Sequence, residues 1–157
     1  MLLSALVFLT GSLGVKALTP TPPSLEYLFF LNATLDSAIN TGAGPSGTRL
    51  AIGITGGSLS GPKGNGTVLP VGGDFGAFDA LGTFNVDSQL VLKMDDGSYL
   101  YTHSVGPVIS GPTAVDRVKF ETGSEKYGWL NEIFAIAVTD FPGSWVALDV
   151  WQVHPST

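Results

Sequence analysis

Hydrophobic and polar residues alternate along much of this chain, and no stretch of ten or more residues follows the period of a helix. Successive side chains of a β-strand point to opposite faces, so a period of two predicts strands. The expected strands cover residues 25–35, 48–55, 67–70, 89–94, 98–104, 114–122, 132–139 and 144–153, with a loop over 36–46. The chain is therefore predicted to be all-β.

One hairpin has a clear local signal. Asp95, Asp96 and Gly97 separate two alternating runs, and Asp-Gly in such a place is a strong indication of a tight turn. The two aspartates could also contact calcium, although a turn is the favoured interpretation. On the second arm, Tyr101 and His103 share one face of the expected strand.

Glycine is concentrated in one region, with nine glycines between residues 52 and 76. Their spacing is not that of a phosphate-binding loop, and glycine in a strand pattern indicates bulges, corners and close backbone approach. Short strands with glycine corners favour a single antiparallel barrel of about eight strands, lipocalin-like, with room inside for one small ligand. A strongly coiled sandwich is the alternative.

The first residues have the pattern of a targeting segment. Residues 1–17 are mostly apolar and end in small residues, which predicts a secretory signal peptide, and they are too short for a membrane span of about 20 residues. A buried first helix is the alternative. Residues 18–24 form a proline-rich leader, which leaves one domain over residues 25–157.

Two glycosylation sequons, at Asn32 and Asn65, agree with passage through a secretory pathway. If Asn32 carries a glycan, it faces outward, and alternation then places Tyr27, Phe29 and Leu31 in the interior. The expected signal peptide and the sequons together predict a secreted glycoprotein.

Charge and composition exclude several kinds of partner. The net charge is −6, and loss of Lys16 with the signal peptide would make the remaining chain more acidic. Nucleic acid binding needs clustered basic residues, which this chain lacks, and no basic amphipathic segment suggests membrane binding. The acidic balance favours a neutral ligand over an anion. Self-association into a homo-oligomer stays open.

Known catalytic and cofactor motifs are absent from the sequence. The only histidines are His103 and His154 and there is no cysteine, so neither a metal site nor a bound cofactor is expected. There is no nucleotide-binding motif and no nucleophile elbow. A serine triad around His103 would have to be built from scattered residues.

A group of polar and aromatic residues remains as the candidate site. His103 is the main candidate, since a histidine beside Tyr101 on a strand suits proton transfer near neutral pH. Each of these residues also has a structural interpretation, such as a turn cap or core filling. The candidate catalytic residues are His103, Tyr101, Asp74 and Asn131, and the candidate substrate-binding residues are Phe120, Tyr127, Trp129, Asp87 and Gln89.

Several blocks of sequence resemble one known family. Residues 54–62, 66–74, 95–97, 120–123 and 127–131 resemble, in order and spacing, the small β-barrel family catalogued as domain of unknown function 3237, over about residues 25–153. The resemblance implies a compact barrel with an open cavity. Bacterial members tend to carry arginine at the positions of Gln89 and His103, so this chain is expected to take a neutral, aromatic or terpenoid ligand.

The resemblance also implies a type of reaction. Secreted fungal members of this kind resemble enzymes that guide hetero-Diels–Alder cycloadditions between a quinone methide and an alkene. A cycloaddition needs two partners held in a reactive pose, and orientation alone contributes about 7 to 11 kcal/mol. A cofactor-independent cyclase acting on hydrophobic small molecules is therefore expected. The alternatives are a non-catalytic carrier of such molecules and a purely structural secreted protein.

Overall fold

The computed structural model describes residues 21–156. The expected signal peptide, residues 1–17, and the first part of the leader lie outside these residues. Residues 21–23 have no regular structure, and the first strand begins at Ser24. Within the described part of the chain, no helix is long and apolar enough to cross a membrane.

Ten strands and one short 3₁₀ helix make up the described chain. They are β1 (Ser24–Leu35), β2 (Ile39–Gly44), β3 (Gly47–Ser60), β4 (Gly66–Asp74), β5 (Ala77–Phe78), β6 (Phe84–Met94), β7 (Tyr99–Ser110), β8 (Thr113–Glu121), η1 (Gly128–Glu132), β9 (Ala135–Asp140) and β10 (Trp145–His154). All eight expected strands are present, and the hairpin around Asp95 to Gly97 is confirmed as β6 and β7.

Two details of the predicted strands are wrong. The loop expected over 36–46 contains β2, which is exposed along its whole length. Because β2 has no buried face, it has no alternating pattern to reveal it. Residues 132–134 do not belong to the next strand, because η1 extends to Glu132 and β9 begins at Ala135.

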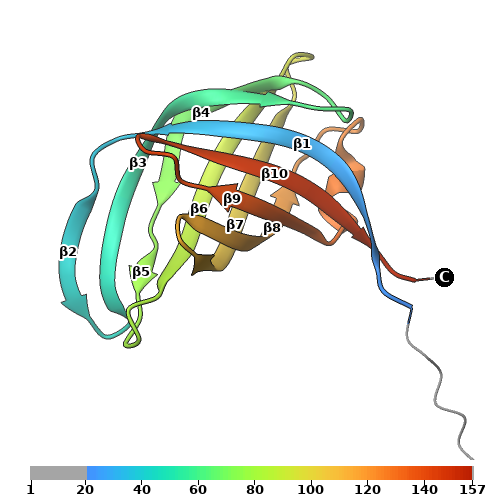
Figure 1. Ribbon diagram of the computed structural model, residues 1–157. Coiled ribbons are helices and arrows are strands. Elements are labelled where there is room, and N and C mark those ends of the chain that lie inside the picture. Colours follow the sequence, from blue (N-terminus) through green and yellow to red (C-terminus); the bar gives the residue numbers. More distant parts are fainter. Residues whose placement is uncertain (1–20, 157) are drawn as a thin grey trace, which may run out of the picture.

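The strands form an antiparallel barrel. Hydrogen-bonded neighbours follow the order β1-β10-β9-β8-β7-β6-β4-β3, and pairing between β1 and β3 closes the ring of eight strands. β2 and β5 lie outside this ring against β3 (Figure 1). The predicted all-β class and eight-stranded barrel are therefore confirmed, and each barrel strand has a neighbour on both sides.

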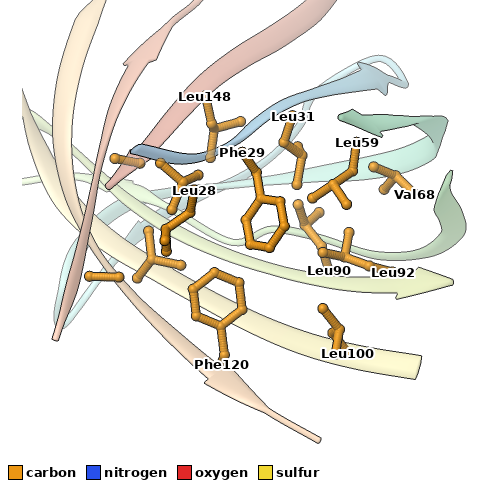
Figure 2. Close-up of a cluster of buried hydrophobic side chains, with 14 of the residues drawn as sticks. Leu28, Phe29, Leu31, Leu59, Val68, Leu90, Leu92, Leu100, Phe120 and Leu148 are labelled. Atoms are coloured by element: carbon orange, nitrogen blue, oxygen red, sulfur yellow. The ribbon is translucent and has the colours of Figure 1, made fainter. Parts of the chain in front are cut away.

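The two ends of the barrel differ. η1 lies at the end of the barrel where β1 begins and β10 ends, whereas β2 and β5 lie at the opposite end (Figure 1). The end next to η1 is filled by a hydrophobic core in which Phe29 and Phe120 pack with ring centroids 6.3 Å apart (Figure 2). Leu130 of η1 is fully buried in this core. We call this the closed end, and the other the open end.

The glycine-rich region bends the sheet as expected. The pairing of β3 with β4 changes register between Gly53 and Gly57, and the pairing of β4 with β6 changes between Val68 and Gly72. Gly57 and Gly72 both have positive φ, and a Cβ on either would lie 2.1 Å from a carbonyl oxygen of the neighbouring strand. Only glycine allows both this conformation and this approach.

A bulge in β1 alters part of the expected register. Phe29 and Leu31 are buried in the core, as predicted. Tyr27 instead lies on the outer face, where its hydroxyl donates to Asp149 and its ring packs on Trp151. The pairing with β10 shifts between Tyr27 and Phe29, so the alternation changes phase there.

Candidate functional site

A cavity of about 340 Å³ occupies the open half of the barrel. This is within the size range of small-molecule sites. Its lining is mostly apolar and includes Leu35, Leu50, Ile52, Ile54, Phe78, Phe84, Val86, Leu90, Val108, Pro112, Phe141, Val146 and Leu148. The expected small-molecule cavity is therefore present in the barrel.

Two buried carboxyl groups interrupt the apolar lining. Asp74 is the last residue of β4 and is 6% exposed, whereas Asp116 lies in the middle of β8 and is 1% exposed. Both line the cavity. Carboxyl groups in such surroundings favour the protonated form, because burial penalises the charge.

Asp116 is held in an asymmetric way. The hydroxyl of Thr139, on the adjacent strand β9, donates to Oδ2 of Asp116 at 2.6 Å. Among the described residues, Oδ1 is buried without a hydrogen-bond partner. Burial, together with the nearby charge of Asp74, raises the pKa of Asp116 to about 6, and the hydrogen bond from Thr139 opposes this rise.

A glycine on the neighbouring strand makes room for this carboxyl. A Cβ on Gly106 of β7 would lie 2.6 Å from Oδ1 of Asp116 and 2.2 Å from the carbonyl oxygen of Val115. Any larger residue at this position would have to displace the carboxyl group or the strand. Gly106 therefore fixes where Oδ1 can lie.

Asp74 is held by the backbone. Its Oδ1 accepts hydrogen bonds from the N–H groups of Gly76, at 2.9 Å, and Asp87, at 3.0 Å. Burial raises the pKa of Asp74, and these two N–H groups oppose the rise because they stabilise the anion. Two N–H groups therefore stabilise the anion of Asp74, whereas a single hydroxyl group stabilises the anion of Asp116.

Four predicted site residues lie on the outer face of the barrel. Tyr101 and His103 alternate with the buried inner residues of β7. On β6, Gln89 is directly opposite His103, and Asp87 is opposite Val105. His103 Nε2 is 2.8 Å from Asp87 Oδ1, with Arg49 on the other side of that carboxylate. None of the four lines the cavity. These four residues were expected to lie at the cavity, but their strands turn the opposite face inward.

The other predicted residues, except Asp74, belong to the closed end. Phe120 and Tyr127 are buried in the core rather than in the cavity wall. Trp129 is 37% exposed, with the Lys63 ammonium 5.8 Å from its ring centroid. Asn131 exchanges hydrogen bonds with both backbone groups of Thr122 and so fastens η1 to the end of β8.

Sequence reasoning missed Asp116, although the pattern around it contains a signal. Ala114, Asp116, Val118 and Phe120 occupy alternate positions of one strand, and the other three residues of this set are apolar. A single aspartate on an otherwise apolar face indicates a buried carboxyl, which needs a structural or chemical reason.

The sequon asparagines differ in their surroundings. Asn32 is half-buried, and its Oδ1 accepts from the N–H and hydroxyl of Ser58. Asn65 is exposed in the turn between β3 and β4, where its Oδ1 accepts from Gly61 N–H. Asn65 is therefore the more accessible site for glycan attachment.

Among residues 21–156, no group of three or more potential ligands is arranged to hold a metal ion.

Fold and cavity together define a small antiparallel β-barrel with a ligand-sized apolar interior and two buried carboxyl groups. The chain belongs to the family described as Protein of unknown function (DUF3237), whose model matches residues 23–153.

Relatives with known sequences and structures agree with this assignment. The hydroalkoxylation enzyme phnH of Penicillium herquei is 32% identical over 155 residues, covering 98% of this chain and 97% of the relative. The crystal structure of an enzyme from the same fungus has a TM-score of 0.71 at 29% identity, covering 88% of this chain and all of that one. A protein of unknown function from Rhodopseudomonas palustris has a TM-score of 0.80 at 28% identity, covering 86% and 99%. The similarity to fungal enzymes supports an enzymatic role.

Proposed function

We propose that this protein is a cofactor-independent cyclase that closes an oxygen-containing ring by adding a hydroxyl group across an alkene of a neutral, hydrophobic molecule. The observation that carries this proposal is the pair of buried carboxyls, Asp74 and Asp116, in an otherwise apolar cavity. Two such groups with different surroundings suit general acid and general base roles. The similarity to an enzyme named for hydroalkoxylation supports the same reaction type.

In the proposed step, protonated Asp116 gives its proton from Oδ1 to one carbon of the alkene. The substrate hydroxyl oxygen forms a bond to the other alkene carbon, and its proton passes to the carboxylate of Asp74. The product is an isomer of the substrate, and return of one proton from Asp74 to Asp116 restores the enzyme. No other reactant takes part.

The surroundings of the two carboxyls suit these roles. Oδ1 of Asp116 has no partner among the described residues, so a proton there is not held by another acceptor. Asp74 accepts two backbone N–H bonds that stabilise its anion and hold it in place. The apolar walls exclude water, which strengthens the electrostatic interactions of both groups and protects a cationic intermediate.

The cycloaddition implied by the family resemblance would use the same cavity. A hetero-Diels–Alder reaction between a quinone methide and a terpenoid alkene depends mainly on orientation, and it transfers no proton to carbon. The buried acid therefore favours hydroalkoxylation for the ring-closing step. A protonated carboxyl can also assist loss of water to generate a quinone methide, so this cycloaddition is the second candidate.

The test is to incubate the protein with 3-geranylcatechol in D₂O and analyse the chroman product by chiral chromatography and mass spectrometry. Hydroalkoxylation is expected to give an enantiomerically enriched chroman with one deuterium on the former alkene carbon, since the acid proton exchanges with solvent. The Asp116→Asn variant should give about 100-fold less product or lower still.

Other outcomes distinguish the alternatives. Enriched adduct from a quinone-methide precursor and an added alkene, without new deuterium on carbon, would favour the cycloaddition. Tight binding with only racemic background product would favour a carrier. A product yield unaffected by Asp116→Asn would overturn the proposed acid.

A further inference from the structure

The polar side chains of the cavity form one continuous band. Asp74 on β4 is directly opposite Ser88 on β6, and Ser88 is directly opposite Ser104 on β7. Asp116 on β8 and Thr139 on β9 continue the band through their hydrogen bond. All five residues line the cavity. The band thus crosses five neighbouring strands, and we call it the polar belt.

The opposite wall of the cavity is apolar. It is formed by β1, β3 and β10, which contribute Leu35, Leu50, Ile52, Ile54, Val146 and Leu148. A ligand in this cavity therefore meets hydrogen-bonding groups along one side and only hydrocarbon on the other. Polar ligand groups against the apolar wall would lose their hydrogen bonds to water without replacement.

The two serines in the belt are free to bind a ligand. Ser104 is 2% exposed and Ser88 is half-buried. Side-chain hydrogen bonds among residues 21–156 engage Asp74, Asp116 and Thr139 but neither serine hydroxyl. A hydroxyl group both donates and accepts. Directly opposed residues on antiparallel strands have Cβ atoms about 4.5 to 5.5 Å apart, so the two hydroxyls can bracket neighbouring oxygens of one ligand.

We propose that Ser88 and Ser104 determine specificity by binding two neighbouring oxygen functions on one edge of a flat, neutral molecule, whose remaining surface lies against β1, β3 and β10. Such a substrate has its reacting hydroxyl on the edge that faces Asp74 and Asp116. This inference extends the proposed cyclase by naming its substrate class, but the binding preference itself requires no turnover.

The belt explains why the substrate would bind in one orientation. Turning the molecule over would place its oxygens against leucine, isoleucine and valine side chains and leave both serines unpaired. A site built to hydrogen-bond a substrate discriminates strongly against molecules that lack those groups, because its own polar atoms are then left unsatisfied.

The experiment compares the binding of two isomers, 2,3-dihydroxynaphthalene and 2,6-dihydroxynaphthalene, by their intrinsic fluorescence. Both are flat and neutral, but only the 2,3 isomer has its oxygens on one edge. The wild-type protein is expected to bind the 2,3 isomer at least about tenfold more tightly. The Ser88→Ala and Ser104→Ala variants should each weaken its binding about fivefold, and the double variant should bind the two isomers equally.

Thr102→Val is the matched control, since Thr102 is a buried inner residue of the same strand as Ser104 and does not line the cavity. It should leave the preference unchanged. Equal binding of both isomers to the wild-type protein, or a preference that survives in the double variant, would overturn the belt as the specificity determinant. Preference for the 2,3 isomer in a protein that does not cyclise 3-geranylcatechol would leave the belt standing and count against the cyclase.

Discussion

The hydroxyl of Thr139 donates to only one oxygen of Asp116, Oδ2 at 2.6 Å, and Oδ1 has no partner in residues 21–156. This single hydrogen bond sets the rotation of a carboxyl group buried in the barrel. It also stabilises the charged form of Asp116 against the effect of burial. The acid strength of Asp116 thus depends on a residue of the neighbouring strand.

The pH dependence of catalysis should follow Asp116. Burial raises its pKa to about 6, so the acid form is lost as pH rises through this value, and kcat/KM should fall about tenfold per pH unit above it. Thr139→Val removes an interaction that lowers this pKa, so the falling limb should move to higher pH. Initial rates of ring closure between pH 4 and 9 measure both profiles. A limb at the same pH in both proteins would contradict the assignment.

The stability of the fold should depend on pH through the same group. Asp116 has a higher pKa in the folded chain than its ordinary value of 3.8, so the folded state holds the proton more tightly between about pH 4 and 6. The free energy of unfolding therefore decreases as pH rises through this window, by on the order of 3 kcal/mol. Urea unfolding of wild type and Asp116→Asn at several pH values would reveal this difference.

The comparison with the variant isolates Asp116 from other carboxyls. Lys126 and Ser98 lower the pKa of Asp96 to about 2, so its stabilising effect is lost only as pH falls through more acidic values. Such groups act equally in both proteins. The stability of Asp116→Asn relative to wild type should increase from pH 4 to pH 8, and a constant difference would show that Asp116 has an ordinary pKa.

Replacing one residue inside the barrel and one outside should show whether catalysis depends on the cavity or on the outer face. Asp74→Asn is expected to lower kcat about 100-fold, because the proposed base is lost. His103→Ala should change kcat less than about twofold, since His103 pairs with Asp87 on the outer face. Chroman formation by both purified variants checks this. Loss of activity in His103→Ala with an unchanged melting temperature would return His103 to the site.

Gly106→Ala should disturb the site by crowding Asp116. The added methyl would lie 2.6 Å from Oδ1 and 2.2 Å from the Val115 carbonyl oxygen, and overpacking of this kind costs about 1 to 3 kcal/mol. Gly123→Ala is the control, since a Cβ there meets nothing within 4 Å. The melting temperature and the activity should both fall in Gly106→Ala, and neither should fall in Gly123→Ala. Equal melting temperatures would show that the strands relax around the methyl.

Truncating an aromatic residue should reduce the stability of the fold more at the closed end of the barrel than at the open end. Phe29→Ala removes a fully buried ring from the core, with an expected loss of about 3 to 5 kcal/mol. Phe78 is 39% exposed at the cavity, so Phe78→Ala should cost less than about 1.5 kcal/mol while weakening ligand binding. Chemical denaturation and ligand titration of both variants measure this contrast, and equal losses of stability would argue against it.

Much of the fold could be predicted from the sequence because it depends on local pattern. Alternation located the barrel strands, and the glycines marked the register shifts at Gly57 and Gly72. β2 was not predicted because a strand that is exposed on both faces has no alternating pattern of hydrophobic residues. The change of inward-facing side in β1 was not predicted, because nothing in the residues from Tyr27 to Phe29 distinguishes a bulge from a regular strand.

The site was harder to predict because alternation does not say which face of a strand is inside. On β7, one face has Tyr101 and His103, and the other has Leu100, Thr102 and Ser104. Neither set is clearly more apolar, and the face with the obvious chemical groups proved to be the outer one. The inward direction is decided by pairing with distant strands, which local sequence does not contain.

The division of the interior into a packed half and a hollow half has a consequence for how such barrels diversify. Phe29, Phe120 and Leu130 stabilise the closed end, so replacements around the open end are expected to change the preferred ligand at a smaller cost in stability. Reprogramming by mutagenesis should begin with residues of the apolar wall, where no hydrogen bond has to be replaced.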